Sequence, residues 1–147
     1  MAIWGIGAYY FDDREDKSDI FINEGTAFIG YLEKDKPEYY ELIKQVKIGD
    51  VLVLKARFPL NRHVLRIKAI GMATDTNFNL ENGALNRKGI KVKWFFDFRH
   101  APEEIALTKE NNRSDLANTI MKIENESLIE AIAEILKKHG NSPEAAE

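Results

Sequence analysis

The sequence predicts an α+β domain built on a strongly curved mixed sheet or a small β-barrel, with two to three flanking helices. Five or six short apolar segments with strand character follow one another, and a capped amphipathic helix comes last. The 147 residues are 44% hydrophobic and contain no cysteine. A chain of this length buries roughly two-thirds of its unfolded surface. We therefore expect one domain over residues 1–140, with its own core, and a flexible tail over residues 141–147.

The first predicted strand, residues 2–11, is an almost continuous apolar run. Such a run is typical of a strand that is covered on both faces. Gly5 and Gly7 interrupt it, and a glycine weakens a strand unless another group approaches the backbone closely or the strand bends. The two glycines therefore indicate a close approach or a bend. The charged residues 12–17 predict a loop.

A short helix and a second strand are expected next. Asp19 can cap a helix over residues 20–24, and Gly25 can end it. Residues 26–31 then have the composition of a strand.

The next segments predict a helix followed by a hairpin. Pro37 suits the first position of a helix, and apolar residues recur on one stripe of it as far as residue 46. Strands are expected over residues 51–58 and 64–70, separated by a short turn. Alternation in the second strand places Arg66 and Lys68 on the face opposite its apolar side chains.

The second half of the chain is less regular until its last element. Residues 75–89 predict a polar loop rich in Asn and Gly, residues 90–98 a strand, and residues 119–123 a short strand inside an ambiguous stretch. The final helix begins at a capping box formed by Ser127 and Glu130. We interpret this helix as a docking element and not as a site.

Charge is unevenly distributed along the chain. The formal net charge is −3. Between residues 55 and 99, however, ten Lys or Arg residues face three acidic ones, a balance of +7, so the rest of the chain carries −10. This pattern is compatible with a compact cationic face on an otherwise acidic protein.

The sequence lacks the residues and motifs that most catalytic and metal-binding sites require. The absence of cysteine excludes thiolate catalysis, cysteine-bound zinc and iron–sulfur clusters. There is no phosphate-binding loop, and no third glycine follows Gly5 and Gly7 at dinucleotide-binding spacing. His63, His100 and His139 have no second metal ligand at helical spacing. We expect no catalytic residue, no metal and no cofactor.

Aromatic and basic side chains are the remaining functional signal. Tyrosine and tryptophan suit a pocket that is apolar at one end and wet at the other. Stacking contributes roughly 1–3 kcal/mol per nucleic-acid base, and nearby Lys or Arg would contact phosphates. The candidate base-pocket residues are Tyr9, Tyr10, Tyr31 and Trp94, with Trp4 as a fifth that the sheet could bury. The candidate phosphate-binding residues are Arg57, Arg62, Arg66, Lys68, Arg87, Lys88 and Lys91. Phe28, Phe95 and Phe96 are expected in the core.

A set of short motifs resembles a known superfamily. The motifs are WGIG (residues 4–7), EGTAFIGY (24–31), KIGDVLV (47–53), IKAIGMA (67–73) and KVKW (91–94). In this order and spacing they resemble the PUA-like superfamily, and within it the EVE- and YTH-like domains of modification-dependent restriction systems. The stretch from residue 113 to 123 and the final helix resemble the end of those domains.

The resemblance implies a barrel-like sheet with a concave aromatic pocket that holds a flipped, often methylated base. Relatives in that branch commonly end the second strand with Ile-Gly-Trp, whereas this chain has Tyr31, which keeps a ring and adds a hydroxyl. Such relatives are often fused to a nuclease or an ATPase. This chain carries neither, so we expect either a separate nuclease or ATPase subunit or a different ligand.

The leading hypothesis is therefore a nucleic-acid-binding module that reads a modified base, in DNA rather than RNA. Two alternatives remain open. One is a small nucleotide- or RNA-processing enzyme on the same scaffold, with His100 or Asp50 as base. The other is a protein-interaction subunit of a defence operon. No apolar run approaches the ~20 residues of a membrane span and no secretory signal is evident, so we expect a cytoplasmic protein without a membrane partner.

Overall fold

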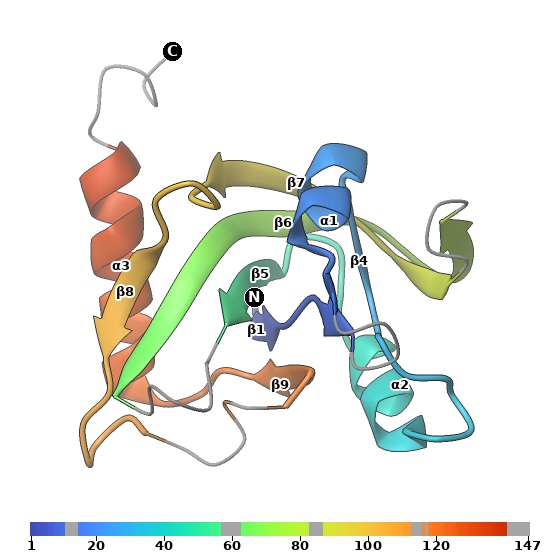
Figure 1. Ribbon diagram of the computed structural model, residues 1–147, viewed down its shortest axis with the longest axis horizontal. Coiled ribbons are helices and arrows are strands. Elements are labelled where there is room, and N and C mark those ends of the chain that lie inside the picture. Colours follow the sequence, from blue (N-terminus) through green and yellow to red (C-terminus); the bar gives the residue numbers. More distant parts are fainter. Residues whose placement is uncertain (11–14, 57–62, 83–86, 113–115, 117, 141–147) are drawn as a thin grey trace.

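The computed structural model describes residues 1–10, 15–56, 63–82, 87–112, 116 and 118–140. Within these residues seven strands form one mixed sheet in the order β4-β7-β6-β5-β1-β9, with β8 paired to β6, and β2 and β3 form a separate ribbon. Figure 1 shows the large sheet curling into a half-barrel, with α3 along one side and α1 and α2 on another. The predicted α+β class, with a curved mixed sheet and flanking helices, is confirmed.

The elements have the following bounds. The strands are β1 (Ile3–Ile6), β2 (Tyr9–Tyr10), β3 (Glu15–Asp16), β4 (Thr26–Phe28), β5 (Val51–Ala56), β6 (Val64–Asn82), β7 (Arg87–Asp97), β8 (Glu103–Ala106) and β9 (Ile120–Lys122). The helices are α1 (Ser18–Glu24), α2 (Pro37–Ile43) and α3 (Glu126–Gly140).

Strand β1 lies inside the sheet, parallel to β5 and antiparallel to β9. Its alternate side chains enter two different cores, Trp4 and Ile6 on one face and Ile3 on the other. The expectation of a strand covered on both faces is confirmed. The expected length is wrong, because β1 ends at Ile6, and Tyr9–Tyr10 pair instead with Glu15–Asp16 in the separate ribbon.

The first glycine of β1 makes room for a lysine. A Cβ atom on Gly5 would lie 2.9 Å from Cε of Lys55, so the lysine stem crosses the strand where no side chain stands. The buried Lys55 ammonium donates hydrogen bonds to the carbonyl oxygens of Leu116 at 2.8 Å and Asn118 at 2.7 Å. The expected close approach at Gly5 is therefore confirmed.

The two faces of the sheet carry two hydrophobic cores. Strand β5 supplies both, with Leu52 and Leu54 on one face and Val53 on the other. Helices α1 and α2 cover the first face, and α3 covers the second. Buried helix residues on the first face are Phe21, Tyr40 and Ile43, and on the second face Leu128, Ile132 and Ile135. No helix among the described residues has the length and apolar character needed to cross a membrane.

Two predicted helix starts are wrong. Helix α1 begins at Ser18, and its first free N–H donates to the Asp16 carboxylate at 2.8 Å, so Asp19 lies inside the helix. At α3 the Asn125 side chain accepts the Leu128 N–H at 3.1 Å, while the Ser127 hydroxyl accepts a hydrogen bond from Asn111. Asn125, directly before α3, therefore takes the capping role at that helix. At α1 the N-cap residue is Lys17, and Asp16, one residue earlier, supplies the acceptor. The end of α1 is confirmed, with Gly25 at a φ of 65°.

The predicted loop over residues 75–89 is also wrong. Strand β6 continues to Asn82, and β7 begins at Arg87, with Asn82 opposite Arg87 and Leu80 opposite Gly89. The pairing of β6 with β7 has register shifts, as expected where a long pair of strands bends. The many Asn residues favoured a loop, whereas the pairing of β6 with β7 extends the two strands over most of this segment. The antiparallel hairpin of β5 and β6 is confirmed.

Candidate nucleic-acid interface

Helix α1 holds one of the predicted aromatic residues against the sheet. The indole N–H of Trp94, on β7, donates a hydrogen bond to the carbonyl oxygen of Phe21 in α1 at 3.0 Å. The Trp94 side chain is half-buried and packs against the first core. Gly71 lies beneath it, since a Cβ there would be 2.9 Å from Cε3 of the indole. The ring is thus fixed in orientation while part of it stays accessible.

A predicted phosphate-binding residue lies beside the start of the same helix. The Lys68 ammonium, on β6, pairs with the Asp16 carboxylate and lies 3.4 Å from the Ser18 hydroxyl. Burial raises the pKa of Asp16, but hydrogen bonds from Lys68 and Ser18 outweigh burial and hold that pKa below its ordinary value of 3.8. Lys68 is therefore anchored in an ion pair.

A second cation reaches α1 from the segment after β7. The Arg99 guanidinium contacts Asp97 through Nε at 3.0 Å and Nη2 at 2.9 Å, and Asp19 of α1 through Nη1 at 3.1 Å. Partial desolvation lowers the pKa of Arg99, but the hydrogen bonds to Asp19 and Asp97 outweigh it and leave the pKa raised. Arg99 was counted among the cations of the sequence, but not among the expected phosphate contacts.

These contacts define one surface, which we call the α1 platform. Its members are Asp16, Ser18, Asp19 and Phe21, with Lys68, Trp94, Asp97 and Arg99 of the sheet. Strand β2 lies next to it, because Tyr9 is paired with Asp16. The side chains of Tyr9 and Tyr10 lie outside the described part of the structure. Trp94, through Phe21, and Lys68, through Asp16, therefore both contact the segment that begins α1, and β2 pairs with the same segment.

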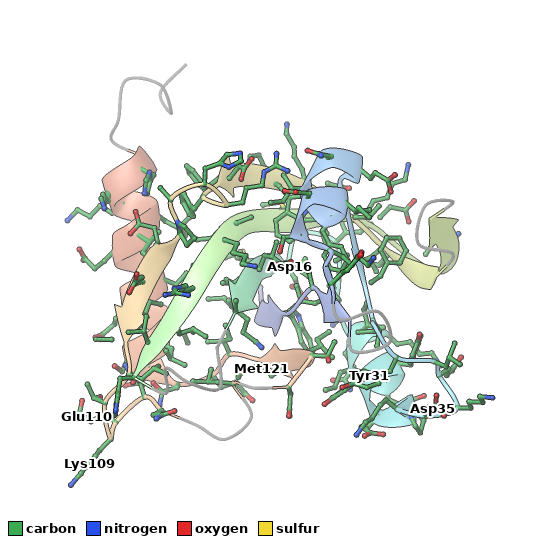
Figure 2. The ribbon with its side chains drawn as sticks, viewed as in Figure 1. Asp16, Tyr31, Asp35, Lys109, Glu110 and Met121 are labelled. Carbon is green, nitrogen blue, oxygen red and sulfur yellow. The ribbon has the colours of Figure 1, made fainter. Side chains whose placement is uncertain are left out.

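Tyr31 lies elsewhere, beside α2. Its ring is 5.8 Å from that of Tyr39, and the Lys36 ammonium is 5.7 Å and 5.8 Å from the two ring centres. The Tyr40 hydroxyl donates to the Tyr31 carbonyl at 2.6 Å. Figure 2 shows Asp16 at α1 and Tyr31 at α2, toward opposite ends of β4. The structure thus does not bring Tyr31 to the α1 platform.

Trp4 belongs to the core. Only 1% of it is exposed, and its N–H donates to Asp50 at 3.0 Å. The buried Asp50 carboxylate also accepts the backbone N–H groups of Ala2 and Lys47. Burial raises the pKa of Asp50, but these hydrogen bonds outweigh burial and lower it below 3.8. A carboxylate that already accepts three hydrogen bonds is a poor general base. The geometry of Asp50 therefore does not favour the alternative of an enzyme with Asp50 as base.

Four of the other predicted phosphate contacts lie on β6 and β7. Arg66 of β6 is half-buried and paired in register with Glu104 of β8, whereas Lys91 is exposed in the middle of β7, opposite Asp75. Arg87 and Lys88 begin β7, but their side chains lie outside the described part. Arg57 and Arg62 also lie outside it. Phe95, expected in the core, is 52% exposed, because it stands at a register shift between β6 and β7.

A shallow groove of about 880 Å³ lies apart from the α1 platform, at the start of β1, where Trp4, Lys47 and Lys122 contribute to its lining. His100, the other candidate base, is exposed on the turn after β7. In the part of the chain that the structure describes, no group of three or more His, Asp or Glu side chains is placed to hold a metal ion.

No protein-family model matches the chain, and no curated protein matches it.

Proposed function

We propose that this protein is a nucleic-acid-binding module that reads a modified base, a methylated base included, by accepting it in a flipped-out position against an aromatic ring. The observation that carries the proposal is Trp94, which is half-buried and held by the Phe21 carbonyl oxygen of α1. Lys68 and Arg99 reach the start of the same helix through Asp16 and Asp19. DNA is the proposed nucleic acid. A nuclease or ATPase acting with it would be a separate subunit.

The energetic terms are of the right size for this function. Flipping a base out of a duplex costs a few kcal/mol. Stacking on an aromatic ring returns roughly 1–3 kcal/mol, and cations that contact the backbone add a salt-dependent term. Extrusion costs least for a mismatched, damaged or unpaired base, so preference for a methylated base has to come from contacts between the site and the modification.

Substitution of Trp94 tests the proposal against a matched aromatic residue on the same strand. Trp94→Ala should weaken binding of a fluorescein-labelled duplex containing one methylated base by roughly tenfold or more, the equivalent of one lost stacking contact. Phe95→Ala removes the exposed ring of the neighbouring residue and should leave affinity within twofold. Trp94→Phe, which keeps a ring, should give an intermediate loss. Equal affinities for Trp94→Ala and Phe95→Ala, in variants shown to be folded by circular dichroism, would refute the proposal.

A further inference from the structure

We infer that Arg99 is a phosphate-binding residue of the α1 platform and that Asp19 occupies its phosphate position in the unbound protein. The inference rests on the proposed function, since the phosphate is that of the nucleic-acid backbone. Arg99 is not among the phosphate contacts expected from the sequence. Its ion pair with Asp19 would keep other polyanions from binding at the site.

Two carboxylates hold the Arg99 guanidinium in different ways. Asp97 lies two residues away, accepts the Arg99 backbone N–H at 3.1 Å, and contacts Nε and Nη2 of the side chain. It therefore sets the direction of the guanidinium. Asp19 comes from α1 and contacts Nη1 alone, at 3.1 Å. If the contact with Asp19 is lost, the contacts with Asp97 remain.

The exposed fractions of the Arg99 and Asp19 side chains indicate that a phosphate can replace Asp19. The Arg99 side chain is 19% exposed, so packing restricts its movement, whereas the Asp19 side chain is 76% exposed. An ion pair with so exposed a partner contributes little to stability, because water competes for the carboxylate. Asp19 can therefore turn away into solvent at small cost, and the guanidinium stays oriented.

A phosphodiester can use the vacated position more fully than Asp19 does, because Asp19 contacts Nη1 alone. The planar guanidinium can donate two parallel N–H groups to one oxyanion, and phosphate oxygens provide the matching geometry. A second cation lies close by, where Lys68 pairs with Asp16 of β3, just before α1. Trp94 is held by Phe21, two residues after Asp19, so a stacked base and its backbone phosphate would lie against one helix.

The charge balance of the platform gives this exchange a consequence for selectivity. Three carboxylates, Asp16, Asp19 and Asp97, face two cations, Lys68 and Arg99, so the closed platform is not positively charged. A polyanion without a base for Trp94 gains little from displacing Asp19. Neutralising Asp19 should remove this barrier and strengthen binding.

The test compares two Asp→Asn variants that change the net charge equally. Asp19→Asn should lower the Kd for the labelled duplex at least threefold relative to Asp35→Asn, an exposed aspartate beside α2 (Figure 2). The slope of log Kd against log salt should steepen by roughly one unit, because Arg99 then makes one net phosphate contact. Arg99→Gln should weaken binding, and in the Arg99→Gln background Asp19→Asn should give no gain over Asp35→Asn.

The contrary results separate this inference from the function beneath it. If the wild-type protein binds the duplex but Asp19→Asn only lowers the melting temperature and matches Asp35→Asn in affinity, the ion pair is a tether for α1 and the inference fails alone. A gain in affinity that persists in the Arg99→Gln background also overturns it. If neither the wild-type protein nor any variant binds the duplex, the inference and the proposed function fall together.

Discussion

The indole of Trp94 lies directly against Gly71 of the neighbouring strand, where a Cβ atom would be 2.9 Å from the ring and 2.5 Å from the Lys93 carbonyl oxygen. The indole ring thus packs directly on Gly71, and its N–H donates a hydrogen bond to the Phe21 carbonyl oxygen. Because both contacts are to backbone, the position of the ring depends on the strand pairing of β6 and β7 and on the seating of α1.

Gly71→Ala should therefore displace the Trp94 ring. We expect the free energy of unfolding to fall by about 1–3 kcal/mol, the usual cost of forcing an extra methyl group into a packed place, and the affinity for the labelled duplex to fall with it. Urea unfolding followed by tryptophan fluorescence measures the first effect. Gly140→Ala is the matched control, because a Cβ there meets nothing within 4 Å. Equal stability of the two variants would show that the indole does not depend on Gly71.

Lys55→Met should destabilise the junction between β5 and the segment around residue 118. The methionine fills the space over Gly5 but leaves the Leu116 and Asn118 carbonyl oxygens without the ammonium that they now accept from. Leaving buried polar groups unpaired costs about 1–3 kcal/mol. Hydrogen exchange should also accelerate at the Gly7 amide, which donates to the adjacent Thr119 carbonyl. Lys109→Met, at an exposed position, is the control, and an equal result for both variants would contradict this role of Lys55.

Asp50 should make stability depend on pH in the acid range. Its pKa is lowered in the folded protein, so its contribution is fully present above the ordinary value of 3.8 and is lost as the pH falls through the folded-state value. Asp50→Asn should lower the unfolding free energy at pH 7 and make its decline below about pH 4 shallower. The decline should not vanish, because the pKa values of Asp16 and Glu103 are lowered too. Urea titrations at several pH values measure the unfolding free energy. If the unfolding free energy of Asp50→Asn declines with acid as steeply as that of the wild type, Asp50 does not contribute to the pH dependence.

The parts of the fold that the sequence predicts are those encoded by local patterns. The apolar run of β5, the αL glycine at residue 25 and the proline that begins α2 each act within a few residues. Strands β3 and β8 escaped prediction because they are short and rich in acidic residues, and β8 is held by a pairing partner, β6, that is distant in the chain. The cap of α3 was misassigned because Asn125 and Ser127 are both good capping residues, and only the contact with Asn111 shows which one is engaged elsewhere.

The site divides in the same way. An aromatic residue with a polar edge beside a cationic segment is visible in the sequence, and Trp94 was found by that signal. The contact of Arg99 with Asp19 joins residues 80 positions apart, and nothing in either local pattern indicates it. The separation of Tyr31 from Trp94 is likewise a consequence of where α1 and α2 seat on the sheet. Residue type therefore identified candidates, and topology decided which of them meet.

The most direct test of the central claim measures binding of the wild-type protein to duplexes that differ in one base. The set contains cytosine, 5-methylcytosine, 5-hydroxymethylcytosine, adenine or N6-methyladenine at one central position, each at two salt concentrations. We expect at least one modified duplex to bind at least fivefold more tightly than its unmodified counterpart, and we expect higher salt to weaken all binding. Equal affinities across the set, or affinities that salt leaves unchanged, would contradict the central claim.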